Sequence, residues 1–238
     1  MVEVRVSETG RESYGATLIL PDPGRPADWP AITRTLRELL PKHRWHTMAI
    51  NPSTDNVTLQ ARIEAAIKQL RSKNISNIAL IAEGKTALSA LQYSQIHAGQ
   101  LRAMVLLNPD HQGLVSVAKT ADKAADAGAE KTEPAVTEPA TTEKKAEKSS
   151  PGEQDLLLES IAMLTIPCLD LATGGSVDDM AHAAQRLAVS RRLNRGQYQQ
   201  VSLPENDSPV SDAQETPLSK RVRGWLGRNA LPPPKAVQ

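Results

Sequence analysis

The sequence predicts an α/β fold in which helices flank a mostly parallel sheet. Short apolar runs that fit strands alternate with segments of helical periodicity, and several runs stop at proline, glycine or asparagine. This alternation is typical of right-handed βαβ units. With 238 residues, the chain is long enough for one sizeable α/β domain or two small ones.

Five strands are expected in the first half of the chain, at residues 2–6, 16–20, 45–50, 77–82 and 103–107. The first alternates valine with charged residues, as a half-buried strand does. Helices are expected between the later strands. Asp28 can cap one that begins near Pro30, Asp55 or Thr54 can cap a second, and a third covers about 85–96. The second is the clearest, with an apolar face made of Leu59, Ile63, Ala66, Ile67 and Leu70.

Regular structure is expected to resume near residue 156 and to give strands at 166–171 and 197–203. Asp178 can cap a helix between them, with Met180, Ala184 and Leu187 on its apolar face. A last helix at 220–229 places Val222, Trp225 and Leu226 on one face. Its basic residues Lys220, Arg221, Arg223 and Arg228 are expected to extend into solvent from the opposite face.

A polar segment interrupts the predicted domain. Residues 118–152 are mainly Ala, Lys, Glu, Thr and Pro, so they cannot bury enough apolar surface to offset the entropy of ordering. We therefore expect an N-terminal part of the domain at 1–117, a disordered linker at 118–152, a C-terminal part at 153–229 and a proline-rich tail at 230–238.

Composition excludes several classes of function. The net charge of +1 gives no overall reason to expect nucleic acid as a partner. The single cysteine, Cys168, excludes an internal disulfide and any multi-cysteine metal site, and we expect a buried, inert thiol. No metal or cofactor is predicted. No apolar run is long enough for stable membrane insertion, and no signal peptide is visible, so the chain as written is expected in the cytoplasm, or in the periplasm if an export signal has been removed.

The most informative stretch is residues 77–88, which fits a buried strand, a tight turn and the start of a helix of small residues. In a nucleophile elbow, G-x-S-x-G, such a turn raises a serine above the sheet. The corresponding residues here are Ala82-Glu83-Gly84-Lys85-Thr86. The central residue, Gly84, has no side chain and cannot attack a carbonyl group.

The chain resembles the α/β-hydrolase superfamily and, more narrowly, the bacterial family DUF3530. The resemblance rests on the order and spacing of residues 18–30, 78–90, 104–109, 166–171 and 221–226. It implies an α/β-hydrolase-like fold with a degenerate catalytic site. Pro21-Asp22 stands where many hydrolases have His-Gly, Glu83 replaces the histidine beside the nucleophile, and Gly84 replaces the serine.

The resemblance places the acid of a triad at Asp178 or Asp179, and the base after Leu203, but no histidine follows His182. The vestigial-site candidates are therefore Pro21, Asp22, Glu83, Gly84, Lys85 and Asp178. Asp22 is expected to pair with Lys85 and to close this site.

Gly84-Lys85-Thr86 also invites comparison with a P-loop, but that motif needs a glycine at position 79, which is Ala79. A weaker hypothesis is an anion held at the helix N-terminus by Lys85 and Thr86. His43 and His46 have a spacing that suits a metal, yet two ligands without a third favour ordinary surface histidines.

Three functions remain open. The first is a non-catalytic α/β-hydrolase-like protein that acts as a binding or scaffold module, with an unidentified protein partner left open. The second is an esterase-like hydrolase with a relocated nucleophile, for example Ser53 or Ser176. The third is an anion or phosphate binder at the Gly84-Lys85-Thr86 turn. The sequence favours the first, and thus a protein that is not an enzyme.

Overall fold

The computed structural model of the chain describes residues 3–5, 12–23, 31–51, 53–110, 151–173, 177–193, 197–203 and 215–231. Its strands are β1 (Glu3–Arg5), β2 (Gly15–Leu20), β3 (Trp45–Ala49), β4 (Ile78–Glu83), β5 (Ala103–Leu107), β6 (Cys168–Thr173) and β7 (Tyr198–Leu203). Its helices are α1 (Ala31–Leu39), the 3₁₀ helix η1 (Leu40–His43), α2 (Asn56–Ser72), α3 (Thr86–Ile96), α4 (Pro151–Ala162), α5 (Val177–Arg192) and α6 (Pro217–Asn229).

The strands form one sheet in the order β1-β3-β2-β4-β5-β6-β7. Strands β2 to β7 are parallel, and only β1 pairs antiparallel, at the edge beside β3. In the centre, Leu18 of β2 lies opposite Met48 on one side and Leu80 on the other. The predicted fold class, a mostly parallel sheet flanked by helices, is therefore confirmed.

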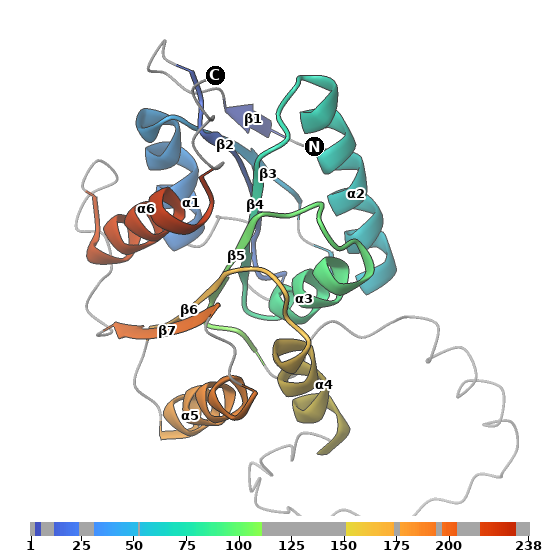
Figure 1. Cartoon of the computed structure of the whole chain (residues 1–238), viewed down its shortest axis with the longest axis vertical. Helices are drawn as coiled ribbons and strands as arrows, with labels where there is room; N and C mark the ends of the chain where they lie inside the picture. Colours follow the sequence, from blue (N-terminus) through green and yellow to red (C-terminus); the bar gives the residue numbers. More distant parts are fainter. Residues whose placement is uncertain are drawn as a thin grey trace, which may run out of the picture.

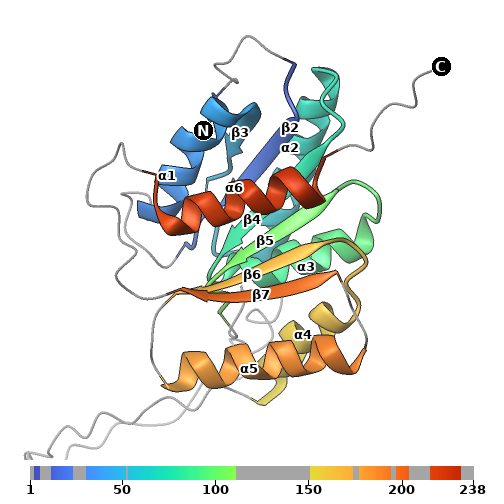
Figure 2. The same ribbon diagram turned by 60° about the vertical axis from the view of Figure 1, so that its left-hand side comes forward.

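Helices cover both faces of the sheet. Figures 1 and 2 show α1 and α6 on one face, and α2 and α3 on the other, with α4 and α5 beside β6 and β7. Each layer has its own core of buried side chains. Trp45, Trp225 and Leu36 belong to the core under α1 and α6, whereas Ile63, Leu91 and Leu157 belong to the core under α2, α3 and α4.

The helix α2 bears out its sequence prediction. The carboxylate of Asp55 accepts a hydrogen bond from the Thr58 N–H at 2.8 Å, which caps the helix N-terminus. The buried residues of α2 are the five that were expected: Leu59, Ile63, Ala66, Ile67 and Leu70. The helix α6 also buries Val222, Trp225 and Leu226 as predicted, although it begins earlier, at Pro217 after the N-cap Thr216.

The prediction for α5 was wrong in two respects. The helix begins at Val177, so Asp178 lies in its first turn instead of capping it. The buried residues are Ala183, Arg186 and Ser190, whereas Met180 is 64% exposed. The physical reason is that α5 packs over a buried carboxylate of β6, which Arg186 contacts, so the inward face of α5 is partly polar.

Some expectations fall on residues that the structure does not describe. These include Asp28, Ser176, most of the predicted linker and most of the C-terminal tail. The helix α4 begins at Pro151, near the end of that linker, and the domain boundaries stay predictions. Within the described ranges, every helix is too short or too polar to cross a bilayer.

Candidate functional site

A cavity of about 600 Å³ opens at the carboxyl ends of the parallel strands. Its floor comes from the ends of β4, β5, β6 and β7, and one wall comes from α5; the lining residues include Asp22, Glu83, Gly84, Asp110, Thr173 and Arg186. The chain reverses its winding direction between β2 and β4, where Asp22 and Glu83 lie. In open α/β sheets, ligands bind outside the carboxyl ends of the strands at such a switch point.

The turn after β4 has the backbone of a tight elbow. Gly84 has φ of 56°, in the left-handed region that favours glycine. Its N–H donates to the carbonyl of Leu107 at 3.0 Å, and its own carbonyl accepts from the N–H groups of Ala87 and Asp110. These bonds join the turn to β5, to the first turn of α3 and to the loop after β5, so three neighbouring segments hold the elbow.

The hydroxyl of Thr86 completes this turn. It accepts a hydrogen bond from the N–H of Glu83 at 3.1 Å and is placed to donate to the carbonyls of Glu83 or Leu20. Thr86 is fully buried. Its hydroxyl therefore ties the start of α3 to β4 and β2, a structural role that leaves it poorly suited to hold an external anion.

Asp22 fills the space beside Gly84 that a side chain at this position would need. A Cβ built on Gly84 would overlap Oδ2 of Asp22 and would lie 2.7 Å from its Cγ. That contact is shorter than real Cβ atoms allow, so no side chain fits at position 84 unless Asp22 moves. The glycine thus satisfies two demands at once, the left-handed φ and the close approach of the carboxylate.

Carboxylates dominate the lining of the cavity. Asp22, Glu83, Asp110 and Asp179 all contribute to it, and Glu83 is only 1% exposed. Among the described residues of the lining, Arg186 is the one cationic side chain, and its charge is balanced by Asp170. The described side chains at the ends of β2, β4 and β5 therefore offer mainly acceptors.

Behind α5, a buried polar network centres on Asp170 of β6. The carboxylate is fully buried and accepts hydrogen bonds from Nε of Arg186 at 2.7 Å, from the hydroxyl of Tyr198 and from Nε2 of Gln200 at 2.9 Å. Gln200 also donates to the carbonyl of Ala183 in α5. The network fixes α5 against β6 and β7 and so sets the width of the cavity.

Burial and charge shift the acid–base equilibria of this network. Burial, followed by the neighbouring Asp170, raises the pKa of Tyr198, so its hydroxyl remains a donor. Burial alone would lower the pKa of Arg186, but the attraction of Asp170 outweighs it and raises that pKa above its ordinary value. Both shifts keep the ion pair and its hydrogen bonds intact around neutral pH.

The sequence-predicted site residues are only partly brought together. Asp22, Glu83 and Gly84 line one cavity, and Pro21 lies buried next to Asp22. Lys85 is outside the lining and, among the described residues, forms no ion pair with Asp22, so the predicted closing pair is not present. Asp178 is exposed and outside the lining, whereas its neighbour Asp179 contributes to it.

The part of the cavity lining that the structure describes contains neither histidine nor cysteine. Its hydroxyl groups are those of Thr173 and Ser202, and Thr173 Oγ1 accepts a hydrogen bond from the Asn108 amide. Asp22, Glu83 and Asp110 do not form a metal site with each other, since the described residues hold no cluster of three possible ligands. His111, which follows Asp110 in the sequence, lies outside the described residues.

Sequence reasoning missed the Asp170 network. A signal was available, because Asp170 interrupts the apolar run Cys168-Leu169-Asp170-Leu171. A carboxylate in a strand that is otherwise apolar must find a cation or several donors when the strand is buried. Its partners Arg186, Tyr198 and Gln200 could not be chosen from many polar residues without the fold.

The family is decided by a match that covers nearly the whole chain. The family model described as "Protein of unknown function (DUF3530)" matches residues 4–59 and 53–228. The chain belongs to the DUF3530 family. No curated protein sequence matches this DUF3530 protein.

Solved structures similar to this DUF3530 protein are hydrolases by their descriptions. A dienelactone hydrolase from Anabaena variabilis ATCC 29413 has a TM-score of 0.62 at 12% identity, covering 96% of this chain and 91% of that one. A monoacylglycerol lipase from Paleococcus ferrophilus has a TM-score of 0.62 at 10% identity, covering 96% and 98%. The esterase domain of a Rhodothermus marinus protein has a TM-score of 0.61 at 11% identity, covering 95% and 92%. The DUF3530 protein therefore has the α/β-hydrolase fold, and at such identities the likeness establishes the fold alone.

Proposed function

We propose that this DUF3530 protein is a non-catalytic binding or scaffold module built on the α/β-hydrolase fold. The observation that carries the proposal is the overlap between Asp22 and any side chain placed at Gly84. The nucleophile position has no nucleophile, and the space above it is filled by a carboxylate. Attack on a carbonyl carbon would require both a reactive side chain and room for the tetrahedral intermediate at this point.

The surroundings of Gly84 support the same proposal. The carboxylates of Asp22, Glu83 and Asp110 line the part of the cavity where an oxyanion would need donors. A cavity of about 600 Å³ nevertheless remains, which is a usual size for a ligand or for an inserted side chain of a partner. The acceptor groups of the lining suit a ligand that donates hydrogen bonds, and they give no support to anion binding at the Gly84-Lys85-Thr86 turn.

The first experiment is labelling of the purified full chain with a fluorophosphonate probe, together with a panel of p-nitrophenyl esters and a known serine esterase as positive control. We expect no labelled serine and no turnover above buffer. Esterase turnover that disappears in Ser53→Ala, Ser176→Ala or Ser202→Ala would overturn the proposal and would identify a relocated nucleophile.

The second experiment tests binding through the cavity. Ala184 is exposed and lines the cavity, whereas Ala188 is exposed on the same helix outside the lining. Immobilised wild-type protein is used to capture partners from a lysate of its source, beside Ala184→Trp and Ala188→Trp. We expect Ala184→Trp to lose the captured partner and Ala188→Trp to retain it. Equal capture by both variants would contradict a role for the cavity.

A further inference from the structure

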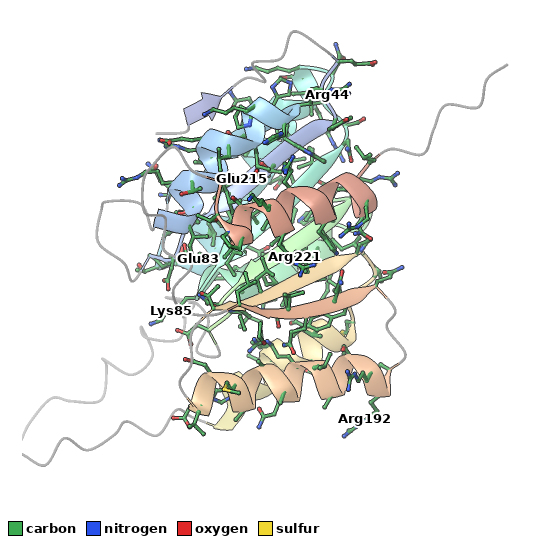
Figure 3. The ribbon with its side chains drawn as sticks, turned by 90° about the vertical axis from the view of Figure 1, so that its left-hand side faces the viewer. Arg44, Glu83, Lys85, Arg192, Glu215 and Arg221 are labelled. Carbon is green, nitrogen blue, oxygen red and sulfur yellow. The ribbon has the colours of Figure 1, made fainter. Side chains whose placement is uncertain are left out.

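A second cavity, of about 710 Å³, lies at the opposite end of the sheet from the first. It is lined by Tyr14, Lys42, His43, Arg44, Trp45, Arg223, Gly224 and Gly227. Trp45 begins β3, so this cavity is at the amino ends of the parallel strands, whereas Glu83 ends β4 at the carboxyl ends. Figure 3 shows Arg44 at one end of the sheet and Glu83 and Lys85 at the other.

Among the described residues around this second cavity, positive charge exceeds negative charge. Lys42, Arg44 and Arg223 are permanent cations, and the carboxylate that the structure places among them is Glu215. Glu215 is 2.8 Å from Nε of Arg223 and 3.8 Å from Nε2 of His43. Lys42 forms no ion pair with any described carboxylate.

The guanidinium of Arg44 is held in place without being neutralised. Its Nε and Nη2 atoms both donate to the carbonyl of Glu12, the former at 2.8 Å. The group stacks over the ring of Tyr14, with 4.1 Å from its carbon to the ring centroid. Arg44 also adopts φ of 69°, which residues other than glycine, asparagine and aspartate rarely do. The hydrogen bonds and the ring contact thus hold a cation at the rim of the cavity.

Two glycines of α6 form an open wall. Gly224 and Gly227 lie inside the helix, three residues apart, and so share a face. Glycine weakens a helix interior, and a Cβ at either position would meet no atom within 4 Å. Packing among the described residues therefore gives no reason for glycine at these positions. A ligand that lies close against the backbone of α6 would give one.

We propose that this cavity binds a ligand through a phosphate monoester group. A phosphate dianion matches the excess of fixed cations better than a carboxylate does, and arginine side chains pair well with its oxygens. Lys42 of η1 and Arg44, the residue after η1, contact the phosphate, Arg223 contacts it from α6, and the rest of the ligand lies against Gly224 and Gly227. This site is separate from the carboxylate-lined cavity and does not depend on it.

The imidazole of His43 provides a direct readout. Burial, then the charge of Arg223, lowers its pKa below the ordinary value, while Glu215 opposes this shift and Lys42 adds to it. A bound dianion adds negative charge to the same groups and therefore raises this pKa. The experiment follows the ring resonances of His43 by NMR as pH is varied, with and without inorganic phosphate or glycerol 3-phosphate, and His43→Gln assigns the signals.

We expect glycerol 3-phosphate to raise the pKa of His43 and Lys42→Gln to weaken binding about tenfold, the usual effect of losing one charge-assisted contact. Lys68→Gln is the matched control, because Lys68 is an exposed lysine on α2, across the sheet. Binding of glycerol 3-phosphate that leaves the pKa of His43 unmoved, or equal affinity in the two lysine variants, would overturn the proposal.

The double variant Gly224→Ala/Gly227→Ala separates binding from folding. Alanine favours the helix, so the melting temperature should rise while affinity for glycerol 3-phosphate falls. A higher melting temperature with unchanged affinity would contradict the proposed wall.

A further experiment measures binding of the protein to vesicles that contain phosphatidic acid. Binding of glycerol 3-phosphate alone assigns a soluble ligand, binding of the vesicles alone assigns a lipid headgroup, and binding of neither overturns the proposal.

Discussion

Replacing Gly84 by alanine tests the close approach of Asp22 to the elbow. Two costs should add. A residue with a side chain at φ of 56° loses about 1–2 kcal/mol in the left-handed region. The new Cβ would also lie 2.7 Å from Cγ of Asp22, and overpacking of this kind costs about 1–3 kcal/mol. The free energy of unfolding should therefore fall by about 2–5 kcal/mol, measured by urea denaturation.

A double-mutant cycle separates the two costs. In an Asp22→Ala background the overlap is gone, so Gly84→Ala should cost only its backbone strain, and the coupling energy should be about 1–3 kcal/mol. Gly99→Ala is the matched control, since Gly99 has φ of 84° and nothing within 4 Å of a built Cβ. It should show strain without coupling to Asp22→Ala. A coupling below about 0.5 kcal/mol for Gly84 would refute the conclusion that Asp22 occupies the space a side chain at position 84 would need.

Three further outcomes are expected. Arg186→Met leaves the carboxylate of Asp170 buried without its cation and should cost about 3–5 kcal/mol in urea unfolding; a loss below about 1 kcal/mol would contradict the structural role. Burial raises the pKa of the Cys168 thiol, so Ellman's reagent should react only after denaturation, and prompt reaction of the native protein would count against its burial. Burial lowers the pKa values of His43 and His46 from 6.5, so the unfolded chain binds protons more readily. Stability should thus fall as pH drops through 6.5, and a slope unchanged in His43→Gln/His46→Gln would contradict this.

The fold was predictable because its signals are local. The apolar face of α2 repeats at helical spacing, and Asp55 stands where an N-cap belongs, so neither depends on the rest of the chain. The same holds for the short apolar strands β2 and β5. The parallel order of the sheet then follows from the alternation of strands and helices, which leaves few topologies open.

The polar parts of the fold were not predictable because their partners are distant in sequence. The inward face of α5 carries Arg186, which was not among the residues that the helical pattern assigned to the apolar face. Asp170, 16 positions away, brings it inside. Likewise, the acidic candidates Asp22 and Glu83 were found by resemblance, but the contribution of Asp110 and Asp179 to the same cavity depends on how two loops and α5 meet.

The backbone of the elbow is consistent with the proposed absence of a nucleophile. A left-handed φ strains serine but not glycine, so glycine at position 84 leaves the turn without this strain. Once no side chain projects there, a carboxylate can occupy the space without a clash, and Asp22 does so. A carboxylate in this place would oppose the oxyanion that a hydrolase must stabilise. A serine placed at position 84 would therefore introduce backbone strain and a clash with Asp22, and these alone would not make it a working nucleophile. For this reason we expect the cavity to serve binding.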